Sequence, residues 1–182
     1  MNDCCATSSR DNPAVSQPAT LASFAVRPGV TFPDWSAVTS PVVKNALQAM
    51  VGSDHVLNRW SGYDPATDRV RVALLRLYAD HGGAPTISAL AERTKLSEMV
   101  IRPLLDELRR RDLVVLDGEL IVGAYPFSDH NTGHRVTLDG RTLNAMCAVD
   151  ALGIGAMTDR DTAIASPCGH CGALIRITTQ DR

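Results

Sequence analysis

The residues best suited to chemistry are a cysteine and an aspartate three positions apart, Cys147 and Asp150. They lie in an apolar run with helical spacing between Arg141 and Leu152. Because residues i and i+3 share one face of a helix, this spacing places a thiol beside a carboxylate. A thiolate binds soft metal ions, and a neighbouring carboxylic acid can deliver a proton to a group carried by the metal. Cysteine often only packs in a core, but aspartate is seldom buried unless it is paired.

The other cysteines form two local pairs, Cys4 with Cys5 and Cys168 with Cys171. An odd total of five, without an export signal, argues against a disulfide framework and for thiols that serve metal binding or catalysis. The C-x-x-C of Cys168 and Cys171 is typical of half a zinc site, and we predict both as metal ligands. A structural cysteine in a turn is the alternative there, and an incidental pair is the alternative for Cys4 and Cys5.

Helical and strand patterns predict the elements that position these residues. Apolar residues at helical spacing end at Gly82, two shorter helical patterns follow, and a hairpin is predicted around Asp117-Gly118. A second hairpin around Asp139-Gly140 precedes a helix expected over 144–157. Short strands are expected at 162–165 and 174–178. The predicted class is α+β, with a winged-helix-like three-helix unit and a small mixed β-sheet domain that carries one active-site helix.

The same patterns divide the chain into three parts. We expect a flexible N-terminal tail over 1–40, a helical winged-helix-like domain over 41–125, and a catalytic or metal-binding α+β domain over 126–182. The segment 65–125 carries nine basic and nine acidic residues, and the whole chain has a net charge of −2, so a nucleic-acid partner is not expected. Without a membrane-spanning run or a signal peptide, we expect a cytoplasmic protein.

Three segments together resemble the organomercurial (alkylmercury) lyase family. They are the Arg135–Asp139 strand, the run from Gly140 to Leu152 with its Cys-Ala-x-Asp helix, and the Ser166-Pro167-Cys168 turn followed by Gly172-Ala173. The likeness extends from about Leu90 to Thr178.

That resemblance implies protonolysis of carbon–mercury bonds, R-Hg⁺ to RH and Hg(II), with Cys147 as the first thiolate and Asp150 as the proton shuttle. It implies no required cofactor, with mercury bound as substrate and product. An organomercurial is the expected partner, and cellular thiols or mercuric reductase are the expected acceptors of Hg(II).

One departure from the family concerns the second catalytic thiol. The family's late cysteine lies in a C-terminal segment beyond the Ser-x-Cys turn, whereas this sequence ends at Arg182. We therefore expect a short member in which Cys4 or Cys5 takes that role.

Two other functions remain open. One is a non-catalytic protein that binds or senses soft metals through Cys147, Cys168 and Cys171 on a truncated lyase scaffold. The other is a metal-responsive winged-helix regulator. Asp150 favours the enzyme, because a pure thiolate trap needs no acid beside its sulfur, and the neutral helical unit disfavours the regulator.

Overall fold

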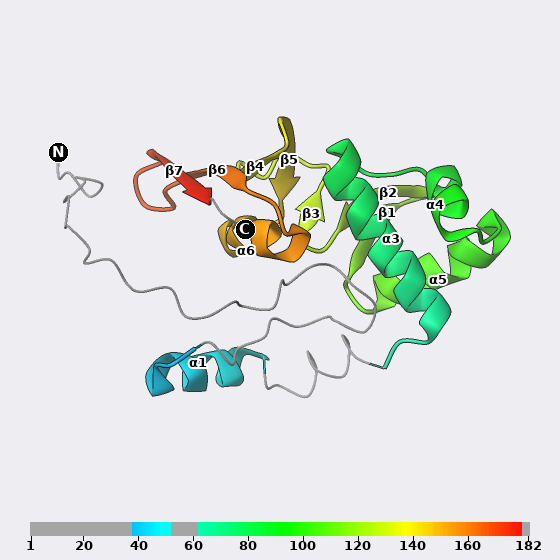
Figure 1. Cartoon of the computed structure of the whole chain (residues 1–182), viewed down its shortest axis with the longest axis horizontal. Helices are drawn as coiled ribbons and strands as arrows, with labels where there is room; N and C mark the ends of the chain where they lie inside the picture. The colour runs from blue at the N-terminus through cyan, green and yellow to red at the C-terminus, as the bar shows by residue number, and fades with distance from the viewer. Residues whose placement is uncertain (1–37, 52–61, 180–182) are drawn as a thin grey trace.

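The computed structural model describes residues 38–51 and 62–179, and the predicted α+β class is confirmed (Figure 1). The described helices are α1 (Pro41–Val51), α3 (Pro65–His81), α4 (Ile87–Thr94), α5 (Glu98–Arg110) and α6 (Ala148–Thr158). The described strands are β1 (Val114–Asp117), β2 (Leu120–Ala124), β3 (Phe127–Ser128), β4 (Arg135–Leu138), β5 (Arg141–Ala145), β6 (Thr162–Pro167) and β7 (Leu174–Thr179). No helix among these residues combines the length and apolarity needed to cross a membrane.

Helix α3 is the central helix of the N-terminal half, and its ends follow from its sequence. Its first turn is capped by Asp64, whose carboxylate accepts from the backbone N–H groups of Ala66 and Thr67 at 2.9 and 3.1 Å. It ends at Gly82, which adopts the left-handed conformation that favours glycine (φ 80°) and donates to the Tyr78 carbonyl at 2.8 Å. Helices α4 and α5 pack against α3, and the hairpin of β1 and β2 follows them.

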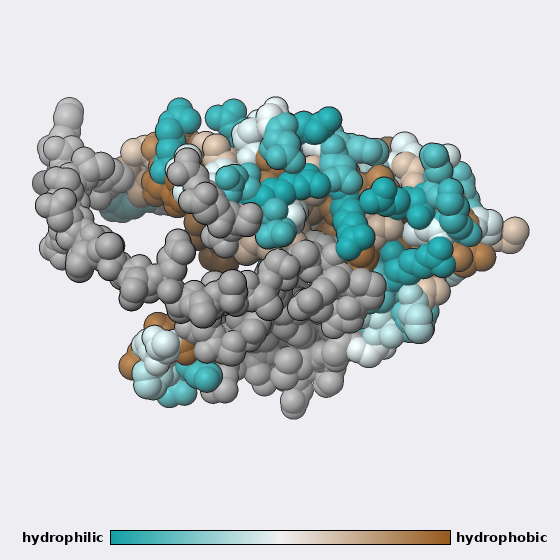
Figure 2. All heavy atoms as spheres, viewed as in Figure 1, coloured by the Kyte–Doolittle hydropathy of each residue, from teal (hydrophilic) through white to brown (hydrophobic). Residues whose placement is uncertain are grey.

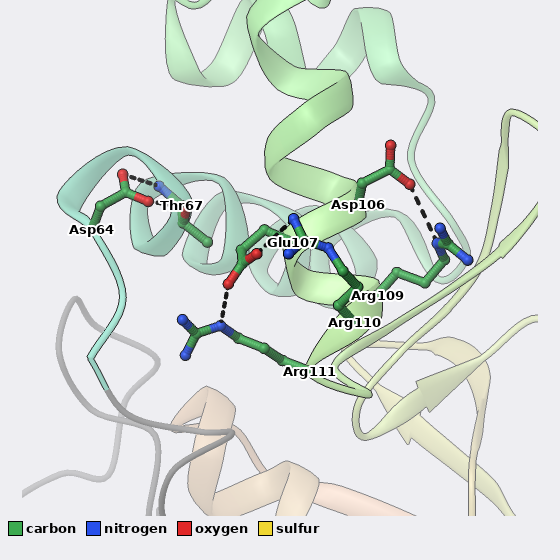
Figure 3. Close-up of polar contacts among 7 residues, drawn as sticks. All are labelled: Asp64, Thr67, Asp106, Glu107, Arg109, Arg110 and Arg111. Atoms are coloured by element: carbon green, nitrogen blue, oxygen red, sulfur yellow. Dashed lines mark hydrogen bonds and ion pairs between the residues drawn. The ribbon is translucent and has the colours of Figure 1, made fainter.

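At the C-terminal end of α5, basic side chains form ion pairs with neighbouring acidic side chains (Figure 3). Glu107 binds Arg110 and Arg111, each at 2.7 Å, and Asp106 binds Arg109 at 3.3 Å. The Arg111 guanidinium is the main cause that lowers the pKa of Glu107. These pairs balance charge along the helix that would be the basic reading helix of a DNA-binding winged helix. The absence of a nucleic-acid partner stays a prediction.

Within the described residues, seven strands form one sheet in the order β1-β2-β3-β5-β4-β6-β7. Every neighbouring pair is antiparallel, so the expectation of a mixed sheet is corrected. Four of these pairs, β1-β2, β2-β3, β4-β5 and β6-β7, consist of consecutive strands joined by short connections, and strands joined in this way run in opposite directions. Strand β3 joins the first hairpin to the remaining strands, so the sheet continues across the expected boundary at residues 125 and 126. The division into domains stays a prediction.

Helix α6 covers one face of the sheet across β4, β5 and β6 (Figure 1). It buries Ala151 and Ile154 fully. The helical half joins the sheet through the aromatic rings of Tyr78 and Phe127, which stack with centroids 5.3 Å apart and planes 12° apart. One continuous core therefore links α3 to the strands that support α6.

Candidate functional site

The site lies where strand β5 turns into helix α6. The expectation that residues 144–147 are helical was wrong, because β5 continues to Ala145 and α6 begins only at Ala148. Asn144 pairs with Ser128 of β3 on one side and with Arg135 of β4 on the other, so its backbone belongs to the sheet and not to the helix. Cys147 consequently has an extended backbone (φ −147°, ψ 177°) and occupies the N-cap position of α6.

The helix cap brings the thiol and the carboxylate together. The backbone N–H of Asp150 donates to the Cys147 Sγ at 3.4 Å, in the manner of an N-cap side chain. The Cys147 side chain is also hydrogen-bonded to the Asp150 carboxylate. Because an ionised carboxylate only accepts hydrogen bonds, the thiol is the donor in this bond. The pair predicted from spacing is therefore adjacent, through the cap rather than through a shared helical face.

The two residues differ in their exposure. Asp150 is buried, with 7% of its surface exposed, whereas Cys147 is exposed at the start of the helix. On the outer face of the same helix the apolar side chains of Val149 and Leu152 are exposed, at 74% and 48%. In Figure 2, hydrophobic residues show at the end of the molecule where β6 and β7 lie and again near α5, where Met99 is 81% exposed, while hydrophilic residues dominate over α3. A ligand from solvent therefore reaches the exposed sulfur before the buried carboxylate.

The surroundings of Cys147 favour the protonated thiol. Desolvation of the sulfur is the larger cause that raises its pKa, and the hydrogen bond with Asp150 is the next. The two backbone N–H groups at the helix start act in the opposite direction. At neutral pH the thiol therefore keeps its proton and shares it with Asp150 until an electrophile or a metal binds the sulfur.

Tyr125 is a third member of the site that the sequence analysis missed. Burial and then a hydrogen bond to the Asp150 carboxylate raise the pKa of Tyr125 above its usual range. Its place is fixed by two backbone bonds, from Tyr125 N–H to the Leu113 carbonyl and from Met146 N–H to the Pro126 carbonyl, both 2.9 Å. The Asp150 carboxylate is thus hydrogen-bonded both to the Tyr125 hydroxyl and to the Cys147 thiol. No spacing in the sequence indicates this contact, because it arises from sheet pairing between distant segments.

The remaining predicted residues are placed as follows. Cys168 and Cys171 lie in the connection between β6 and β7 as thiols, the first half-buried and the second exposed. Among the residues that the structure describes, no three or more His, Cys, Asp or Glu side chains gather as a metal site. Cys4 and Cys5 lie outside the described residues. The assignment of catalytic and metal roles to these side chains stays a prediction.

Comparisons with known proteins bear on this geometry. Residues 127–182, which hold Cys147, Asp150, Cys168 and Cys171, match the family model described as MerB: Alkylmercury lyase. The predicted resemblance to the alkylmercury lyases is confirmed. A curated alkylmercury lyase from Staphylococcus epidermidis is 35% identical over 107 residues, which make up 59% of this chain.

Two further facts define the extent of that likeness. The chain spans about half of the staphylococcal lyase, 48% of its length. Among solved structures, the mercury-bound form of MerB2 is similar with a TM-score of 0.55 and 24% identity, over 76% of this chain and 63% of that one. This structural likeness supports the α+β fold.

Proposed function

We propose that this protein is an organomercurial lyase that cleaves carbon–mercury bonds by protonolysis. The observation that carries the proposal is the hydrogen-bonded pair of an exposed Cys147 thiol and a buried Asp150 carboxylate at the start of α6. The match of residues 127–182 to the alkylmercury lyase family supports it. A thiol captures mercury because both partners are soft, and the carboxylate supplies what a simple trap lacks, a carrier for the proton.

In the proposed first step, the Cys147 sulfur bonds to the mercury of R-Hg⁺. The thiol proton passes along the existing S–H···O hydrogen bond to the Asp150 carboxylate. Tyr125 keeps that carboxylate in place by donating its hydroxyl. No proton is lost to solvent, so the acid for the second step is generated by the binding of the substrate.

In the second step, another thiolate binds the same mercury atom and raises the electron density on the carbon. Asp150 then protonates this carbon, the carbon–mercury electron pair becomes the new C–H bond, and RH leaves. Hg(II) remains bound to two sulfur atoms, and Asp150 returns to its ionised form. The scheme uses only thiols, a carboxylate and the substrate, so the proposed reaction needs no cofactor.

The proposed source of the second thiolate is the Cys4-Cys5 pair, with a cellular thiol as the external equivalent. A cytoplasmic location would supply reduced thiols that remove the product, directly or through mercuric reductase. Deletion of residues 1–6 separates the two sources. If Cys4 or Cys5 is required, the deletion abolishes turnover at low external thiol while the circular dichroism spectrum stays that of the full chain. Full activity of the shortened chain would exclude the pair.

The proposed activity is tested by incubating the reduced protein with phenylmercury and excess small thiol and measuring benzene by gas chromatography. The wild-type protein should release benzene over many turnovers, and Cys147→Ser should release none, because an alcohol is a poor ligand for mercury. Stoichiometric retention of phenylmercury without benzene would contradict the lyase. It would favour a thiol-based mercury-binding protein on the same scaffold.

A further inference from the structure

The connection between β6 and β7 holds two thiols in a tight turn. The Cys168 N–H donates to the Ala173 carbonyl at 2.8 Å, and the Gly172 N–H donates back to the Cys168 carbonyl at 2.9 Å. Gly172 has φ +71°, a conformation that favours glycine, so the residue after Cys171 turns the chain back into β7. The turn thereby fixes the backbone on both sides of the C-x-x-C, and both cysteines are thiols.

Two sulfur atoms on one turn suit a particular kind of ligand. A closed structural zinc site takes four ligands. A soft ion such as Hg(II) is satisfied by two thiolates in a nearly linear arrangement. Cys168 is half-buried and Cys171 is exposed, so an ion from solvent reaches the turn without unfolding of the hairpin.

The turn lies at the same end of the sheet as the Cys147 site. Asn144 of β5 and Ala165 of β6 both pair with Arg135, on opposite sides of β4. Cys147 and Cys168 each follow three residues beyond these partners, on strands that run in the same direction. Two interstrand spacings separate β5 from β6, about 10 Å in total.

We infer that Cys168 and Cys171 form a second metal site, a dithiol that chelates one Hg(II) ion apart from the Cys147 site. This site goes beyond the proposed lyase function, because the chelation of Hg(II) needs neither Asp150 nor the cleavage of a carbon–mercury bond. The turn has already ordered the backbone of both ligands, so the second sulfur binds intramolecularly after the first. Such chelation resists competing monothiols far better than a single thiol does.

The test uses full-length chains in which Cys4, Cys5 and Cys147 are all replaced by serine, so that only Cys168 and Cys171 remain. This two-thiol protein is compared with matched chains that carry in addition Cys168→Ser or Cys171→Ser. Each protein is loaded with HgCl₂, dialysed against increasing concentrations of 2-mercaptoethanol, and analysed for mercury per chain. Circular dichroism before and after loading checks that the fold is unchanged.

The two-thiol protein should retain one Hg(II) per chain, and each single-thiol protein should lose it at a monothiol concentration about 100-fold lower. Loss of mercury from all three proteins at the same concentration would overturn the site. One mercury per two chains in the two-thiol protein would also overturn it, because the ion would then bridge molecules instead of one turn. Since Cys147 is absent throughout, neither result depends on the lyase activity.

Discussion

At the scale of single residues, the site is a carboxylate held between two donors. The Cys147 thiol and the Tyr125 hydroxyl both hydrogen-bond to the Asp150 carboxylate, and the Cys147 sulfur caps the helix by accepting from the Asp150 backbone N–H. The sequence predicts the first pair, because residue types and spacing alone bring a thiol to a carboxylate. It does not predict Tyr125, since that contact depends on which strands pair. The sequence therefore indicates the Cys147 and Asp150 pair, whereas Tyr125, the third residue of the site, is found only from the fold.

The raised pKa of Cys147 predicts how its reactivity depends on pH. A thiol whose pKa is raised becomes nucleophilic only at higher pH, so alkylation of Cys147 by iodoacetamide should have a midpoint above that of an ordinary cysteine. Asp150→Asn removes the anionic carboxylate but leaves the desolvation, so the midpoint should fall part of the way back. The rates are measured in chains where the other four cysteines are serine. An unchanged midpoint in Asp150→Asn would show that the thiol does not share its proton with this carboxylate.

The Tyr125 hydroxyl is predicted to act as a positioning group. Tyr125→Phe keeps the ring but removes a hydrogen bond to a charged group, typically about 1.5–3 kcal/mol, which corresponds to about a tenfold or greater loss of benzene release. The pH midpoint of Cys147 alkylation should also move, because the carboxylate that faces the thiol is no longer held. Tyr63→Phe, a matched change outside the site, should move neither quantity. A loss of stability with both readouts intact would mean that Tyr125 is only structural.

At the scale of elements, the start of α6 decides the geometry of the site. Helical periodicity over 144–157 predicts a longer helix, but β5 lies between β3 and β4 and its backbone groups are hydrogen-bonded on both edges. Residues 144 and 145 therefore belong to strand β5, and Cys147 becomes the N-cap of α6. The helix itself, both hairpins and the α3 to α5 segment were predicted within a few residues, because their signals are local capping, turn and periodicity signals.

Replacement of glycine by alanine is expected to have opposite effects on stability at two positions of α6. A Cβ at Gly155 would lie 3.0 Å from the Thr162 side chain and 3.1 Å from the Arg160 carbonyl, whereas a Cβ at Gly153 would meet nothing within 4 Å. Gly155→Ala should therefore lower the free energy of unfolding by about 1–3 kcal/mol. Gly153→Ala should raise it by about 0.5–1 kcal/mol, because alanine is the better helix former.

Urea denaturation followed by circular dichroism measures both glycine variants. Equal effects of the two substitutions would contradict the close packing of α6 on β6. Because Gly155 sets how near the helix lies to the sheet, Gly155→Ala should also reduce benzene release more than Gly153→Ala does.

At the scale of the whole molecule, the helical half and the sheet share one core. Strand β3 joins the β1-β2 hairpin to the strands beneath α6, and Phe127 of that strand stacks on Tyr78 of α3. This arrangement could not be read from the sequence, which shows two differently patterned segments but not the short strand that joins them. The α+β class followed from the order of elements, and the antiparallel sheet corrected the expectation of a mixed one.

The shared core predicts that the two halves lose stability together. Phe127→Ala removes a fully buried ring and should lower the free energy of unfolding by about 3–5 kcal/mol. Hydrogen exchange followed by mass spectrometry should show that protection falls by the same factor in α3 and in β4 to β6. Loss of protection in only one of these regions would show that the halves unfold independently.

The most direct test of the central claim is the effect of Asp150→Asn on two quantities measured in one experiment, mercury bound per chain and benzene released from phenylmercury. The variant keeps the Cys147 thiol and the backbone N–H that donates to its sulfur, but its side chain cannot carry the transferred proton. The proposed mechanism predicts that Asp150→Asn binds phenylmercury at the wild-type stoichiometry and releases benzene at least about 100-fold more slowly. Benzene release at the wild-type rate from Asp150→Asn would contradict the assignment of Asp150 as the proton donor and, with it, the proposed mechanism.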